Sequence, residues 1–262
     1  MGLTAAERQQ VAEALRVAET TVVPVPPLVE TFPGLDVVDA YEIALINIRR
    51  RLAAGAVVFG HKVGLSSKVM QEMMGVDEPD YGHLLSDMVL SENRPVDTSR
   101  YLLPRVEVEV GFVLGADLPG AGCTTEDVLA CTAFVVPAIE LIDSRIADWR
   151  IGLCDTIADN ASSCGVVLGA QRRPPAELEL ADIDATLAIN GVQVAAGSSA
   201  AVLGNPAVAV AWLARKVASF GVRLQAGHVV LPGSCTRAYD VTSGDTVVAE
   251  FTGLGTVSLS FT

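Results

Sequence analysis

Basic residues are scarce in this sequence and form no long run. The chain has 18 lysines and arginines against 31 aspartates and glutamates, which gives a formal net charge of −13 at pH 7. We expect no binding to nucleic acid or to an anionic membrane surface, because both need clustered positive charge. The acidic excess is compatible with solubility and with cation binding, and it does not decide between them.

Long apolar runs and paired cysteines are also missing. No apolar run approaches the roughly 20 residues of a membrane-spanning helix. Residues Met1–Arg8 read as the start of an amphipathic helix and not as a signal peptide. The five cysteines are scattered and never form a C-x-x-C pair, which fits buried thiols better than a disulfide or zinc framework. We therefore expect a cytoplasmic protein with no membrane segment.

Several common motifs are absent as well. No G-x-G-x-x-G follows an expected strand, and the chain has neither a Walker loop nor a G-x-S-x-G elbow. Helix and strand signals do not alternate regularly along the chain. We therefore predict an α+β fold in which an N-terminal helical part, residues 1–55, precedes a β-rich catalytic domain, residues 56–262. Its large sheet should be mainly antiparallel and folded on itself.

Local signals place the elements. Thr4 and Glu7 form a capping-box pattern for a helix to about Ala18, and Asp36 caps a second helix that Gly55 ends. An Asn-Gly pair at 190–191 between two short apolar runs is a strong hairpin signal. Residues 76–83 read as a loop rich in acids. Further helices are expected at 66–74, 124–132 and 205–220, and strands at 57–64, 106–114, 133–143, 165–169, 186–189, 192–195, 229–231, 246–251 and 257–261.

A strand of alternating valines and glutamates is the first candidate for chemistry. Glu107 and Glu109 share one face of the expected strand 106–114, about 7 Å apart. Two such carboxylates repel one another unless water or a cation lies between them. A hard divalent cation would turn the repulsion into attraction. The alternative is the solvated outer face of an antiparallel strand.

Glu140 strengthens the metal hypothesis. It interrupts an otherwise apolar strand, where an unpaired buried carboxylate costs several kcal/mol. One helix separates this strand from the strand of Glu109, so the two strands can lie close together. Glu107, Glu109 and Glu140 would then form an oxygen-only site that suits Mg²⁺ or Mn²⁺ and leaves positions open for substrate or water.

Lys62 is the second strong candidate. It is one of only three lysines and lies in an apolar strand flanked by glycines, where an ammonium group needs an anion. It could bind a substrate carboxylate or enolate, or form a structural ion pair with an acid such as Asp80. A Schiff base is conceivable, but nothing in the sequence favours it.

The remaining candidates are weaker. Asp80 could be a general acid or base, although a turn aspartate looks the same. Asn160, Ser162 and Ser163 precede a strand and could orient water or a carboxylate, or cap a helix. Ser234 follows a glycine in a similar segment.

Together these stretches resemble the 2-keto-4-pentenoate (2-hydroxypenta-2,4-dienoate) hydratases of the fumarylacetoacetase superfamily. The resemblance covers nearly the whole chain from about residue 35. It rests on Gly60-His61-Lys62-Val63-Gly64, Gly75–Gly82 with Asp80, Pro104–Glu109, Pro137-Ala138-Ile139-Glu140, Ser144–Trp149, Asp155–Ser162 and Trp212–Lys216.

The resemblance implies a mixed, mainly antiparallel β-sandwich or roll of the fumarylacetoacetase C-terminal-domain type. It also implies Mg²⁺ or Mn²⁺ held by the three glutamates, a homo-oligomer, and a place in meta-cleavage catabolism of aromatics or steroids. Hydrolytic relatives usually offer Asp as third ligand and add a His–Glu pair. Here the third acid is Glu140 and no clear pair is seen, which favours the hydratase branch.

The expected reaction adds water to a 2-hydroxyalka-2,4-dienoate to give a 4-hydroxy-2-oxoacid. Lys62 would neutralise the enolate or carboxylate, Asp80 would move protons, and Ser162 would hold water or a carboxylate. Asn160, Ser163 and Ser234 would bind substrate. One alternative is a 2-oxo-3-enedioate (4-oxalocrotonate) decarboxylase, which needs a basic group for a second carboxylate. No obvious extra lysine or arginine lies beside the motifs, and Arg105 and Arg145 stay open for that role. Another alternative is a non-catalytic cation-binding module.

Overall fold

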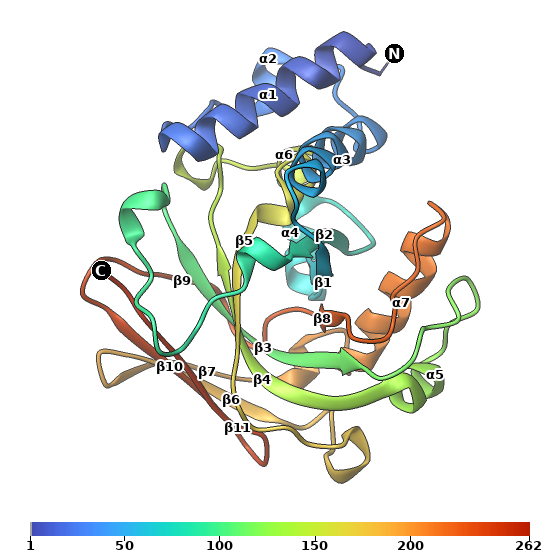
Figure 1. The fold of residues 1–262 in the computed structure, drawn as a ribbon, viewed down its shortest axis with the longest axis vertical. Coiled ribbons are helices and arrows are strands. Elements are labelled where there is room, and N and C mark those ends of the chain that lie inside the picture. The colour runs from blue at the N-terminus through green and yellow to red at the C-terminus, as the bar shows by residue number, and fades with distance from the viewer. Residues whose placement is uncertain (1) are drawn as a thin grey trace.

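A layer of helices lies at one end of the molecule, above a strongly curved sheet system (Figure 1). The computed structural model describes residues 2–262, apart from the side chain of Met73. The layer consists of α1 (Ala5–Thr21), α2 (Leu28–Thr31) and α3 (Val37–Ala53). None of the helices among residues 2–262 combines the length and the apolar character that a membrane crossing requires.

Two sheets follow the helical layer in the described chain. The larger has the strand order β2-β1-β8-β3-β4-β5, with β9 paired to β3, and the smaller has the order β11-β10-β6-β7. All pairs of named strands are antiparallel except β1–β8, which is parallel. The α+β, mainly antiparallel fold expected from the sequence is thus confirmed. The strands are β1 (Val58–Gly64), β2 (Asp80–Leu85), β3 (Arg105–Leu114), β4 (Thr132–Ile142), β5 (Ser163–Leu168), β6 (Asp184–Ile189), β7 (Val192–Ser198), β8 (Val229–Leu231), β9 (Tyr239–Asp240), β10 (Thr246–Phe251) and β11 (Gly255–Ser260).

Four further α-helices of the described chain connect or cover these strands, and their boundaries follow from local chemistry. They are α4 (Lys68–Met74), α5 (Thr125–Cys131), α6 (Leu153–Ala158) and α7 (Pro206–Ala218). The Thr4 side chain accepts the Glu7 N–H in the expected capping box of α1. Asn205 caps α7, whose first residue is Pro206. The hairpin signal is also confirmed, since β6 and β7 pair across Asn190-Gly191.

One local prediction was wrong. Residues 76–83 were expected to form a loop, but Asp80 begins strand β2, which pairs with β1. The acids and turn formers of this stretch hid a strand whose six residues are all buried. As a result Asp80 lies opposite Gly64 in the sheet and does not lie in a turn.

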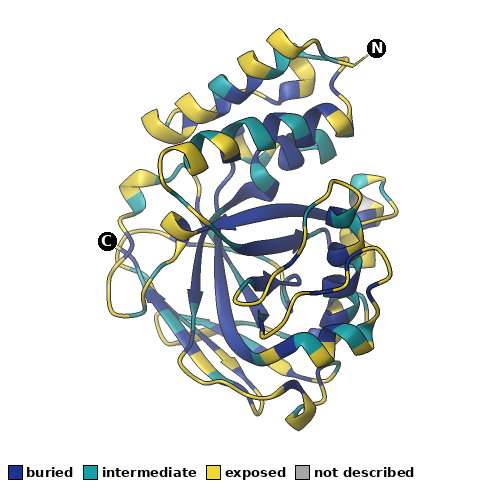
Figure 2. Ribbon diagram, turned by 45° about the vertical axis from the view of Figure 1, so that its right-hand side comes forward, coloured by how far each residue is buried: buried dark blue, intermediate teal, exposed yellow. Residues whose placement is uncertain are grey.

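Burial continues from the helical layer into the sheets. Figure 2 shows the strands of the larger sheet mostly buried, while the helices expose one face. Helix α3 packs against α6, and Val11, Ile43 and Ile157 belong to the same apolar cluster as the sheet residue Val108. The division at residue 55 therefore stays a prediction, although α3 ends at Ala53 and β1 begins at Val58.

Gly60 offers a test of how closely β1 and β8 approach. A Cβ on Gly60 would lie 1.8 Å from the backbone oxygen of Val229. Because backbone on both sides would have to move, Gly60→Ala should destabilise the fold by about 2–3 kcal/mol and lower Tm by about 5–10 °C in a thermal melt. Gly122→Ala is the control, since nothing lies within 4 Å of its added Cβ. Equal melting of both variants would contradict the packing described.

Candidate active site

Three carboxylates converge where β3 and β4 pair. The register places Glu107 directly opposite Glu140, and Glu109 lies two residues further along β3. One ligand oxygen from each lies within 4.8 Å of the others, and this is the one group of its kind among the described residues. Glu109 and Glu140 are fully buried, whereas Glu107 is half-buried. The alternative of a solvated outer face therefore does not describe this strand.

Several buried polar atoms of the predicted site residues lack a hydrogen-bond partner. Apart from both ring nitrogens of His61, all such side-chain atoms among the described residues belong to predicted site residues. They are Oδ1 of Asp80, Oε1 of Glu109, both carboxylate oxygens of Glu140, and the hydroxyls of Ser162 and Ser163. Native structures rarely leave so many buried groups unpaired without a ligand. Carboxylate oxygens are also the donors that Mg²⁺ and Mn²⁺ prefer, so the residues fit a hard divalent cation.

The electrostatics of the three glutamates point the same way. Burial, followed by the charges of Glu140 and Glu107, raises the pKa of Glu109 well above its usual range. Burial raises the pKa of Glu140 to about 7, although the nearby ammonium of Lys62 opposes this. Three carboxylates that repel one another so strongly would gain from a shared cation.

Lys62 projects from β1 toward these carboxylates. Its Nζ lies 3.4 Å from Oε2 of Glu140 and donates a hydrogen bond of 3.1 Å to the carbonyl oxygen of Ala161. Burial disfavours its charged form, but Glu140, Glu107 and the other acids outweigh burial and raise its pKa above the usual value. Lys62 is therefore an ammonium at neutral pH, which suits binding an anion and does not suit Schiff-base formation. Its ion-pair partner is Glu140, not Asp80.

Asp80 lies beside Lys62 at the edge of the larger sheet. It is 2% exposed, and one of its oxygens has no hydrogen-bond partner. Burial raises the pKa of Asp80 to about 6, with Lys62 acting in the opposite direction. A carboxyl group with this pKa can gain and lose a proton near neutral pH, which suits general acid–base chemistry.

The segment before β5 carries Asn160, Ser162 and Ser163, and Asn160 has a structural role in it. Both ends of the Asn160 amide are bound to the backbone of His83: Oδ1 accepts its N–H at 2.7 Å and Nδ2 donates to its carbonyl at 2.9 Å. Ser162 and Ser163 have buried hydroxyls without partners. The geometry thus supports a ligand-binding role for the serines more than for Asn160, whose predicted substrate contact stays a prediction.

Ser234 is engaged with the glutamate strand itself. Its hydroxyl accepts the Val108 N–H at 3.0 Å and donates to the Val108 carbonyl at 3.3 Å. The preceding residue, Gly233, donates its N–H to Oε2 of Glu109 at 2.7 Å. This segment therefore fixes the position of Glu109, and the substrate contact predicted for Ser234 stays a prediction.

Sequence reasoning missed the backbone groups and one buried ion pair. The carbonyl of Ala161 and the N–H of Gly233 carry no side-chain signal. Arg145 and Asp159 form a buried ion pair, and Asp159 directly precedes residues 160–162 in the sequence. Arg145 and Asp159 each lie beside an apolar stretch, which could have indicated that they are buried. Their pairing could not be predicted, because a separation of 14 positions matches no local pattern.

Known proteins are similar to this chain in sequence and in fold. Residues 63–261 match the family described as Fumarylacetoacetate (FAA) hydrolase C-terminal. The 2-keto-4-pentenoate hydratase of Paraburkholderia xenovorans (strain LB400) is 42% identical over 259 residues, which are 99% of this chain and 96% of that protein. The 2-hydroxyhexa-2,4-dienoate hydratase of Comamonas testosteroni is 43% identical over 257 residues, 97% of this chain and 96% of that protein.

The solved structure of an enzyme with a different activity is also similar to this chain. The 4-oxalocrotonate decarboxylase from Pseudomonas putida G7, complexed with magnesium and adipate, has a TM-score of 0.95 and 35% identity, and the match covers 99% of both chains. The resemblance seen in the motifs is thus confirmed by relatives of nearly full length. On these matches, the chain belongs to the fumarylacetoacetate hydrolase C-terminal family.

Proposed function

We propose that this protein is a metal-dependent hydratase that adds water to a short 2-hydroxyalka-2,4-dienoate and releases a 4-hydroxy-2-oxoacid. The observation that carries the proposal is the convergence of three carboxylates and a buried ammonium on one point of the larger sheet. The two hydratases at 42% and 43% identity support the same reaction. Similarity to enzymes over nearly the whole chain argues against a non-catalytic cation-binding module.

Glu107, Glu109 and Glu140 would hold Mg²⁺ or Mn²⁺. When bound, the cation would supply Lewis-acid stabilisation of the negative charge that develops on substrate oxygens. Lys62 would bind the substrate carboxylate or enolate oxygen through its ammonium, which the surrounding acids keep charged. Asp80 would carry protons to and from the substrate carbons, and Ser162 would hold the attacking water or a carboxylate.

Decarboxylation is the second candidate, because the similar solved structure is a 4-oxalocrotonate decarboxylase. That activity would need a basic group for the second carboxylate of its substrate. Arg105 is paired with Asp240 at 2.7 Å and lies over the ring of Trp149, and Arg145 is paired with Asp159. Arg145 is held in a buried pair with Asp159 and so is not free to bind a second carboxylate, which favours hydration.

One assay separates the two reactions. Purified protein with Mg²⁺ or Mn²⁺ is given 2-hydroxypenta-2,4-dienoate or 2-hydroxyhexa-2,4-dienoate in one reaction and a 2-oxo-3-enedioate in another. We expect loss of dienoate absorbance and a 4-hydroxy-2-oxoacid by NMR. Release of CO₂ from the diacid, with no hydration of either monoacid, would establish the decarboxylase instead.

Metal binding should depend on pH. Mg²⁺ binds the charged carboxylates, and the pKa of Glu140 is about 7 before metal binds, so protons compete with the metal below that pH. We expect binding about tenfold weaker at pH 6 than at pH 8, with proton release on binding, measured by calorimetry in two buffers of different ionisation enthalpy. Equal affinity at both pH values would show that these carboxylates do not bind the metal.

Assembly, location and pathway are further proposals. We propose a homo-oligomer that works in the cytoplasm, in meta-cleavage catabolism of aromatics or steroids. All five cysteines are free thiols, which is compatible with a reducing compartment. Light scattering of the purified protein would test the oligomer, and a monomeric mass would refute it.

A further inference from the structure

The segment that presents Ser162 has an unusual backbone. Asn160, Ala161 and Ser162 have φ values of 56°, 50° and 56°, which places three successive residues in the left-handed region. None of them is glycine, and non-glycine residues normally enter this region singly. Such a conformation persists only where the surrounding structure fixes it. The contacts of this segment should therefore show what holds it.

The conformation matters because of what the segment presents. The Ala161 carbonyl accepts the hydrogen bond of the Lys62 ammonium, and the Ser162 hydroxyl is buried without a partner. Both groups would move if the backbone relaxed to ordinary φ values. The segment thus sets the positions of two groups that the proposed reaction uses.

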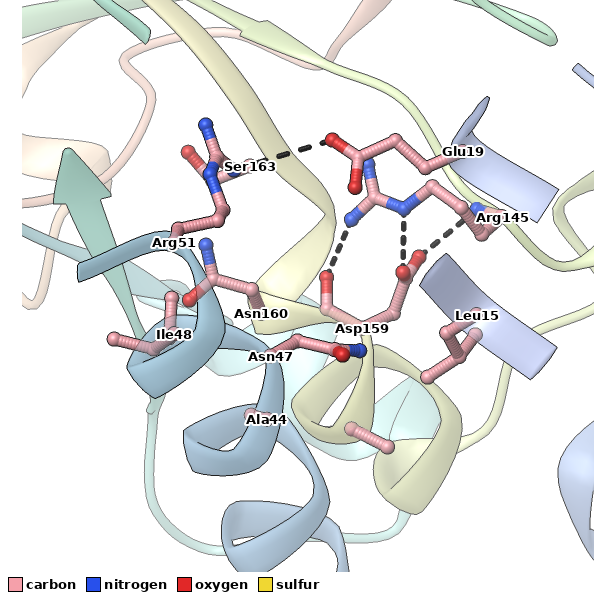
Figure 3. A pocket seen from close by; sticks show the side chains of 11 residues that line it. Leu15, Glu19, Ala44, Asn47, Ile48, Arg51, Arg145, Asp159, Asn160 and Ser163 are labelled. Carbon is pink, nitrogen blue, oxygen red and sulfur yellow. Dashed lines mark hydrogen bonds and ion pairs between the residues drawn. The ribbon is translucent and has the colours of Figure 1, made fainter. Parts of the chain in front are cut away.

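Arg145 contacts the residue at the start of this segment, Asp159. Its guanidinium donates through Nε to the Asp159 carboxylate and through Nη2 to the Asp159 carbonyl at 2.6 Å, and its backbone N–H donates to the carboxylate at 2.9 Å (Figure 3). The same Asp159 carbonyl accepts the N–H of Ser162 at 3.0 Å. Arg145 and Ser162 therefore donate hydrogen bonds to the same carbonyl oxygen, that of Asp159. Both partners of the pair are buried.

The N-terminal helices enclose this pair. A cavity of about 40 Å³ lies beside it, with walls from α1, α3 and the segment itself (Figure 3). Glu19 of α1 and Asn47 of α3 line it together with Asn160. This space can hold a few water molecules but is too small for an organic substrate. The pair is thus a support within the structure and not a second substrate site.

We propose that Arg145 is a positioning residue: through Asp159 it holds residues 160–162 in the left-handed form that places the Ser162 hydroxyl and the Ala161 carbonyl. The effect on catalysis rests on the proposed hydratase function. The bonds of the guanidinium go to Asp159 and not to the three glutamates, so removing them should affect turnover and spare metal binding.

The first test is Arg145→Lys in the full-length protein. Lysine keeps the positive charge but cannot bind the carboxylate and the carbonyl together as the guanidinium does. We expect kcat for the dienoate to fall about 10–100-fold, with KM and the calorimetric Mg²⁺ affinity within about twofold of wild type. The matched control is Arg8→Lys, because Arg8 pairs with buried Asp39 in the helical layer, far along the chain from the segment. It should keep wild-type kcat.

A second variant covers the case in which Arg145→Lys does not fold. In Arg145→Met/Asp159→Leu, apolar residues replace the whole pair, a change that buried ion pairs often tolerate. A wild-type Tm with lowered kcat supports positioning. A wild-type kcat in either variant, or a loss of Mg²⁺ affinity that matches the loss of kcat, would overturn it.

A crystal structure of Arg145→Lys tests the positioning role without relying on an activity assay. We expect residues 160–162 to leave the left-handed region while the three glutamates stay in place. If wild-type protein proves inactive toward dienoates, the hydratase proposal fails, but the structural result still decides whether Arg145 holds the segment. An unchanged backbone at 160–162 would overturn the proposal.

Discussion

Glu109→Gln should lower kcat/KM for 2-hydroxypenta-2,4-dienoate by about 10³-fold or more, while the metal-free protein stays at least as stable as wild type. The activity falls because the site loses a charged ligand, and the stabilisation that a metal supplies to a developing oxyanion amounts to several kcal/mol. Stability is retained because the glutamine amide keeps an oxygen for the Gly233 N–H. The substitution also removes a buried carboxyl group whose pKa is raised by burial and by the neighbouring carboxylates, so that its charged form is already disfavoured.

The measurement pairs steady-state kinetics at saturating Mg²⁺ with thermal melts of the chelated protein. Glu250→Gln is the control, since Glu250 is an exposed strand glutamate in β10. It should match wild type in both assays. A Glu109→Gln enzyme with more than a tenth of wild-type activity would remove Glu109 from the metal site.

Lys62→Met should lower kcat/KM by about 10²–10³-fold, the usual cost of removing one donor that stabilises a developing oxyanion. Methionine keeps an unbranched side chain of similar length, so the buried space stays filled. The ratio of wild-type to variant kcat/KM should stay constant up to alkaline pH. The reason is that the surrounding acids raise the pKa of Lys62, so the wild-type enzyme keeps its ammonium charge there.

The pH profile of kcat/KM from pH 6 to 9 and the Mg²⁺ affinity check this prediction. Lys68→Met is the control, because Lys68 is exposed on α4. If Lys62→Met turned over normally, Lys62 would be only a structural partner of Glu140.

The convergence of the three glutamates could be predicted from the sequence because strand geometry is regular. Alternation put Glu107 and Glu109 on one face, and an isolated glutamate in an apolar run identified Glu140. Adjacent antiparallel strands then brought Glu107 opposite Glu140. The hairpin at Asn190-Gly191 and the cap of α7 could also be predicted from the sequence, because each depends only on residues close together in the chain.

The supporting contacts could not be predicted, because they depend on tertiary structure. The left-handed conformation of Asn160, Ala161 and Ser162 could not be predicted, because none of the three residues is glycine. The carbonyl of Ala161 receives Lys62 only because β1 and the segment before β5 meet in space. Strand β2 was missed for a related reason, since its pairing with β1 overrides the turn-forming composition around Asp80.

The most direct measurement counts bound metal and activity in the same titration. Chelated protein is titrated with Mn²⁺, bound ion is followed by electron paramagnetic resonance, and dienoate hydration is assayed at each point. The structure predicts that activity rises in proportion to the first equivalent bound per chain and that Glu109→Gln prevents both. Full activity in the fully chelated protein, or activity that does not follow the first equivalent, would contradict the account.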